Sequence, residues 1–157
     1  MITPSATCHM TIHFTDLTQR PPRSMRARLG GYMLLPRMLD KGRAEIAGKS
    51  GEYHFNCPLD QRILEYLGID AEALRTELAK GGGDGEILDW IKAHQRNKHT
   101  PAEIEAWSDA QSKRVPDADS QEFFNELLQG AGPNRKDIQT WADLLDLDDY
   151  VTFGGKA

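Results

Sequence analysis

The chain has 157 residues, of which 39% are hydrophobic and 27% charged, and a formal net charge of −5. This length suits one globular domain, and no apolar run approaches the roughly 18 residues that a membrane helix needs. The N-terminus lacks the basic and apolar regions of a signal peptide, and two cysteines, Cys8 and Cys57, are too few for a disulfide framework. We therefore expect a cytoplasmic protein with reduced thiols.

The charges are unevenly distributed along the sequence. Residues 19–49 hold eight basic and two acidic residues, whereas residues 50–157 hold eleven basic and 21 acidic ones. A basic segment of this kind can bind nucleic acid or an acidic partner, but Tyr32 is the only aromatic residue among these bases that could stack on a nucleobase. We favour the alternative that the two parts neutralise each other within one fold, and we expect neither nucleic acid nor a membrane as a partner.

The first part of the chain predicts little regular structure. Residues 11–15 alternate in polarity but have no evident partner strand, and we expect a mobile leader over residues 1–15. The Pro21-Pro22 pair then requires an extended backbone, because each proline disfavours helix at the preceding residue. Residues 25–35 have apolar residues at helical spacing, but two adjacent glycines would cost a helix about 1 kcal/mol each. We predict a short helix or a turn here, interrupted at the glycines.

Two helices are predicted next, from Pro36 to Gly48 and from Pro58 to Gly68. Proline is favoured at the first helical position and glycine just past the last one. A third helix follows Asp70, a fourth begins at residues 84–86, and a fifth opens at a capping box over residues 100–103.

A short sixth helix holds residues 123–128. The last helix spans about residues 137–147, before the C-terminal tail. The aspartates expected to face outward in and just after this helix are Asp143, Asp146, Asp148 and Asp149.

This pattern predicts an all-α fold, namely a single compact domain of six or seven short helices in an irregular orthogonal bundle. We place the domain at residues 16–150 and a C-terminal tail at residues 151–157. The residues expected in the core are Leu39, Ile46, Leu64, Leu67, Leu74, Leu88, Trp90, Trp107, Phe124, Trp141 and Leu144.

Metal or thiol chemistry has little support in the sequence. His54 and Cys57 could supply two zinc ligands, but a closed site needs about four, and the remaining cysteine lies in the leader with His9 and His13. A Cys57 nucleophile with His54 as its base is a further alternative. A small buried residue before a helix is the preferred interpretation of Cys57, and we expect no metal and no cofactor.

The best candidate site lies between the helices that start at Pro36 and Pro58. Arg37 and Lys41 lie one turn apart on the first helix, the second helix presents free N–H groups at its start, and the loop between them mixes aromatic and hydrogen-bonding side chains. We expect a small anionic ligand here, and the alternative is a structural ion-pair network that also includes Asp40 and Arg43. The candidate ligand-binding residues are Arg37, Lys41, Tyr53, His54, Asn56, Asp60 and Gln61.

A resemblance to a known family rests on two runs, DLTQRPPRSMRARLGGYMLLPRMLDKGRAEIAG and GEYHFNCPLDQRILEYLGID, in which the LPRMLDK, GEY and CPLDQ blocks are distinctive. From Asp16 to near its end, the chain resembles the bacterial family called domain of unknown function 5069, although Gly42 stands where we would expect alanine. The resemblance implies a small bacterial cytosolic protein with no established activity, and it transfers no functional residue. A binding or regulatory module is the preferred hypothesis, and its partner is a small anionic ligand or a protein. The alternative is a small-molecule enzyme or an anion-ligand binder that uses a polar pocket between the helices starting at Pro36 and Pro58.

Overall fold

The computed structural model describes residues 11–157, so Cys8, His9 and most of the expected leader lie outside the described part of the chain. Seven helices and one two-stranded hairpin follow in the order β1 (Arg28–Leu29), β2 (Tyr32–Met33), α1 (Leu35–Ile46), α2 (Pro58–Leu67), α3 (Ala71–Leu78), α4 (Asp84–His94), α5 (Pro101–Ser112), α6 (Gln121–Ala131) and α7 (Trp141–Thr152). The predicted all-α fold of six or seven short helices is confirmed, apart from the small hairpin. Among the described residues, no helix is both long and apolar enough to span a bilayer.

The segment before α1 is a β-hairpin. Of the two predicted alternatives, the short helix was wrong and the turn is present at the two glycines. Arg28 pairs with Met33 and Leu29 with Tyr32 in antiparallel register. The two residues between the strands, Gly30 and Gly31, have φ angles of 59° and 84°. A two-residue hairpin turn of this kind needs positive φ at both positions, which glycine adopts without steric cost. The glycines therefore make the turn of a hairpin, and the apolar residues of strand β2 are buried beside them.

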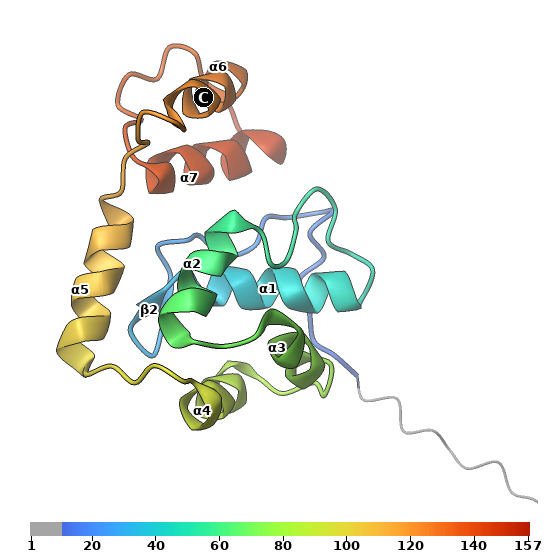
Figure 1. Ribbon diagram of the computed structural model, residues 1–157. Coiled ribbons are helices and arrows are strands. Elements are labelled where there is room, and N and C mark those ends of the chain that lie inside the picture. Colours follow the sequence, from blue (N-terminus) through green and yellow to red (C-terminus); the bar gives the residue numbers. More distant parts are fainter. Residues whose placement is uncertain (1–10) are drawn as a thin grey trace, which may run out of the picture.

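Helix α1 is the central element of the fold. Figure 1 shows it in the middle of the molecule, with α4 below it, α6 and α7 above it, and α5 along one side. Residues 35–44 of α1 are all buried, which includes four charged side chains as well as the apolar ones. Because α1 is enclosed on every side, its charged residues must find partners within the protein.

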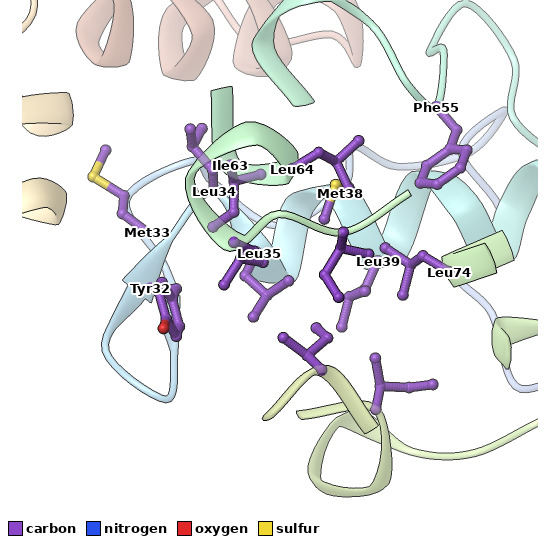
Figure 2. Close-up of a cluster of buried hydrophobic side chains, with 14 of the residues drawn as sticks. Tyr32, Met33, Leu34, Leu35, Met38, Leu39, Phe55, Ile63, Leu64 and Leu74 are labelled. Atoms are coloured by element: carbon purple, nitrogen blue, oxygen red, sulfur yellow. The ribbon is translucent and has the colours of Figure 1, made fainter. Parts of the chain in front are cut away.

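The main core forms between α1 and the elements that surround it. Figure 2 shows Leu35 and Leu39 of α1 close to Ile63 and Leu64 of α2 and to Leu74 of α3. A second, smaller cluster lies between α6 and α7. Six of the expected core residues are buried, namely Leu39, Leu64, Leu67, Leu74, Phe124 and Leu144, and five pack on the two clusters while partly exposed, namely Ile46, Leu88, Trp90, Trp107 and Trp141.

The last helix begins and ends later than predicted. The Thr140 hydroxyl accepts a hydrogen bond from the Asp143 N–H at 3.0 Å, and this N-cap starts α7 at Trp141. The helix then continues to Thr152, past the residue at which a tail was expected. One prediction for this helix was wrong in a way that matters for the site: Asp149, expected to face solvent, is only 6% exposed.

Candidate functional site

Each charged residue of α1 is bonded to a different part of the chain. Asp40 binds Arg23 of the N-terminal segment, Arg37 binds Asp149 of α7, Lys41 binds Asp60 of α2, Arg43 binds Asp84 of α4, and Glu45 binds Arg75 of α3. Four of these five α1 side chains belong to buried residues; only Glu45, near the end of the helix, is partly exposed. Three of these pairs, those of Arg37, Lys41 and Arg43, join a base of residues 19–49 to an acid of residues 50–157, so the two parts of the sequence neutralise each other there as expected.

Arg37, Asp149 and Tyr53 form one half of the charged interior. The Arg37 guanidinium donates to both carboxylate oxygens of Asp149, at 2.7 and 3.2 Å, and Tyr53 donates its hydroxyl hydrogen to Asp149 at 2.7 Å. Burial alone would lower the pKa of Arg37, but the bonds to Asp149 outweigh it and the pKa is raised. Burial and the bond to Asp149 raise the pKa of Tyr53 as well. Arg37 therefore stays positively charged, and Tyr53 keeps its hydroxyl hydrogen, at neutral pH.

Lys41, Asp60 and Cys57 form the other half. The Lys41 ammonium lies 2.9 Å from an Asp60 oxygen and donates to the Cys57 sulfur at 3.2 Å. Burial raises the pKa of Asp60, and Lys41 acts in the opposite direction. The positive charge of Arg37 also acts on Asp60, so the two halves belong to one electrostatic unit. We call Arg37, Lys41, Tyr53, Cys57, Asp60 and Asp149 the α1 charge cluster.

The backbone is strained where α1 and α2 begin. Leu34 and Asn56 have φ angles of 75° and 60°, and they are the two residues other than glycine with positive φ between positions 11 and 157. This region is costly for a branched side chain such as leucine and easier for asparagine. The unusual turn at Asn56 lets its N–H donate to Asp60 at 3.0 Å. Strain of this kind persists only where surrounding contacts hold it, and here the charge cluster lies directly beside it.

The structure brings four of the seven candidate residues together. Arg37, Lys41, Tyr53 and Asp60 lie in the charge cluster, whereas His54, Asn56 and Gln61 are exposed. The two cations are already occupied by Asp149 and Asp60, so the anion expected at this position is supplied by the protein itself. No local sequence pattern pointed to Asp149 as a partner. The excess of acidic residues after position 50 was the only indication that partners for the bases would come from there.

A metal site at this position has no support in the described residues. From residue 11 onward, no group of three or more His, Cys, Asp and Glu side chains is arranged to hold an ion. The Cys57 sulfur contacts the Lys41 ammonium, a cation that would repel a metal.

A hollow of about 300 Å³ lies on the outer side of α2, next to the charge cluster, and we call it the α2 hollow. Its polar lining comes from Asn56, Gln61, Glu65, Asp70 and Arg96, and its apolar lining from Leu64, Ile69 and Ala71. Two of the candidate residues, Asn56 and Gln61, thus line a cavity that could hold a small molecule.

Comparison with known proteins gives one match. The family model described as "Domain of unknown function (DUF5069)" matches residues 19–151, which is most of the chain. The chain belongs to the DUF5069 family. The match includes all seven helices apart from the last residue of α7, together with the whole charge cluster and the α2 hollow. No curated protein matches the sequence.

Proposed function

We propose that this DUF5069 protein is a binding module that holds a small zwitterionic molecule, of the amino-acid class, in the α2 hollow. The observation that supports this is the combination of groups around one cavity. Arg96 offers a cation, Glu65 and Asp70 offer carboxylates, and Leu64 and Ile69 offer an apolar floor. A ligand with a carboxylate, an ammonium group and an apolar side chain would match all three.

The charge cluster supports the proposal indirectly. Because Arg37 and Lys41 are bonded to Asp149 and Asp60, their role in this proposal is to hold α2 and the loop before it in place. Asn56 and Gln61 then contribute amide groups at the edge of the hollow, and Gln61 is steadied by a 3.3 Å hydrogen bond from its amide nitrogen to the Asn56 carbonyl oxygen. The volume of the hollow, near the lower end of the range for ligand pockets, favours a small molecule.

A thermal-shift screen with each common amino acid and its decarboxylated amine tests the proposal. An amino acid present at about a hundredfold its dissociation constant should stabilise the protein by about 2.7 kcal/mol, and the amine should not. Arg96→Gln should abolish the shift, and Glu65→Gln should weaken it. Arg20→Gln removes an exposed arginine that does not line the hollow and serves as the control. A flat screen, or a shift that survives Arg96→Gln, contradicts the proposal.

A further inference from the structure

Arg62 and Arg114 carry positive charges that no carboxylate of the protein matches. Seven other arginines lie within 4.0 Å of an aspartate or glutamate, namely Arg23, Arg26, Arg28, Arg37, Arg43, Arg75 and Arg135. Within residues 11–157, neither Arg62 nor Arg114 forms such a pair, and residues 1–10 contain no acidic side chain. Arg20 and Arg96 also lack an ion pair there. These two side chains and Arg62 are exposed, whereas Arg114 is partly buried.

Arg114 lies where the end of α5 meets the start of α7. Its carbonyl oxygen accepts a hydrogen bond from the Trp141 backbone N–H at 3.1 Å, and its guanidinium carbon lies 5.5 Å from the centre of the Trp141 ring. Two buried donors at this junction, the Arg114 Nε and the Trp141 indole nitrogen, have no hydrogen-bond partner in the described part of the protein. Buried donors are nearly always hydrogen-bonded in folded proteins. The absence of a partner for these two nitrogen atoms therefore needs an explanation.

Arg62 approaches the same junction from α2. Its Nε donates to the side-chain oxygen of Gln111, a buried residue of α5, at 2.9 Å. This bond fixes the guanidinium and leaves its terminal nitrogens available to donate. Burial, followed by the positive charge of Arg62, lowers the pKa of Arg114, and Asp117 acts in the opposite direction. Asp117 itself is exposed and accepts hydrogen bonds from the N–H and hydroxyl of Ser120.

The geometry points to a binding site for a phosphate group at this junction, formed by Arg62, Arg114 and Trp141. The two guanidiniums repel each other as long as no anion lies between them, and a phosphate would replace that repulsion with charge-assisted hydrogen bonds. The terminal nitrogens of Arg62 and Arg114 donate no hydrogen bond within residues 11–157 and are not among the buried unbonded atoms, and this set of donors suits the several oxygens of a phosphate better than the two of a carboxylate. This site lies apart from the α2 hollow and does not depend on the function proposed for it.

An NMR titration that follows the indole N–H signals tests the site. The protein has three tryptophans, and the Trp141 signal is identified by its loss in Trp141→Phe. Sodium phosphate is added at constant pH and ionic strength, with sodium chloride making up the difference. We expect a saturable shift of the Trp141 signal and smaller shifts of the Trp90 and Trp107 signals.

Variants identify the groups responsible. Arg62→Gln removes an exposed side chain and should leave the fold intact while weakening phosphate binding at least tenfold, and Arg114→Gln should do the same if its backbone spectrum remains native. Arg20→Gln, which removes an exposed arginine outside both this junction and the α2 hollow, is the control and should bind as the wild type does. A shift that never saturates, or an affinity unchanged in Arg62→Gln, would mean an adventitious ion only. Tighter binding of acetate than of phosphate would overturn the assignment of the ligand class.

Discussion

Arg37 on α1 donates two hydrogen bonds to Asp149 on α7, a residue 112 positions further along the chain. Both side chains are almost fully buried, at 5% and 9% exposure. Removing one partner leaves the other charge buried without compensation, which typically costs about 3–5 kcal/mol. We therefore expect Arg37→Met and Asp149→Leu each to lower the free energy of unfolding by about that amount, as measured by urea denaturation.

The double variant provides the decisive comparison. Arg37→Met combined with Asp149→Leu removes both charges together, so its loss of stability should be clearly smaller than the sum of the two single losses. Lys80→Ala breaks the exposed Lys80–Glu77 pair and should change stability by less than about 1 kcal/mol. Additive losses in the double variant would show that the two side chains act independently.

The Lys41–Asp60 pair gives a second prediction. Lys41→Met should strongly destabilise the protein, because it leaves the buried Asp60 carboxyl without its cation. Since burial raises the pKa of Asp60, part of this loss should be recovered at acidic pH, where the carboxyl binds a proton and becomes neutral. The Lys41→Met, Asp60→Leu double variant should recover stability at all pH values. Chemical denaturation of Lys41→Met at pH 4 and pH 7 would decide the matter, and equal losses at the two pH values would contradict the role of the Asp60 charge.

The stability of the protein in acid should depend on Asp84, which binds Arg43 at 2.8 Å and Arg23 at 2.7 Å. The hydrogen bond from Arg23 lowers the pKa of Asp84 below its ordinary value, and Arg43 adds to the effect. A carboxyl with a lowered pKa in the folded state stabilises the protein above its unfolded pKa, and this stabilisation is lost as the pH falls through the folded value.

Asp84→Asn should therefore lower stability at pH 7 and flatten the fall in stability below about pH 4. Thermal denaturation across the range from pH 2 to pH 7 measures both effects. Asp89→Asn removes an equal charge from the exposed face of the same helix and controls for the change in net charge. An unchanged acid profile in Asp84→Asn would exclude this carboxyl as a source of the pH dependence.

Gly42 is a position at which alanine should be unfavourable, although alanine is the better helix former. A Cβ atom at Gly42 would lie 2.7 Å from Leu78 Cδ1 and 3.3 Å from Phe55 Cδ2, and both of these side chains are buried. Overpacking of this kind typically costs about 1–3 kcal/mol, which exceeds the gain of about 1 kcal/mol in helix propensity.

Gly42→Ala should accordingly lower the melting temperature. Gly85→Ala in α4 and Gly130→Ala in α6 are matched controls, since a Cβ at either position meets no atom within 4 Å. Both controls should leave the melting temperature unchanged or raise it. A rise in Gly42→Ala would show that α3 can move away from α1 at little cost.

The parts of the fold that depend on local chemistry were predictable. Pro58 at the start of α2 and the capping box at Thr100 fix helix starts through their own backbone and side-chain bonds, and both starts agree with the structure. The hairpin at Gly30 and Gly31 was missed because apolar spacing over a few residues does not distinguish a helix from a short strand pair. The late start of α7 was missed because the N-cap bond of Thr140 was not considered.

The candidate site was only partly predictable for a related reason. Arg37, Lys41, Tyr53 and Asp60 come from neighbouring segments, and their proximity follows from the packing of α1 on α2. Asp149 is far from these segments in the sequence. It stands among several other aspartates, a pattern that is typical of a solvated helix face. Which carboxylate enters the interior depends on how α7 is placed against α1, and that placement is a property of the assembled tertiary structure.

The long separation between Arg37 and Asp149 also bears on how the protein is made. A ribosome releases Arg37 well before Asp149, because 112 residues separate them. Until the C-terminal helix emerges, the nascent chain holds a guanidinium that cannot enter the interior without its counter-charge, and α1 cannot be fully enclosed. We therefore expect the region around α1 to complete its folding only after α7 has been synthesised, in keeping with the folding of a domain as one unit. In a chain truncated before α7, we expect the apolar side of α1 to stay accessible to chaperones and proteases.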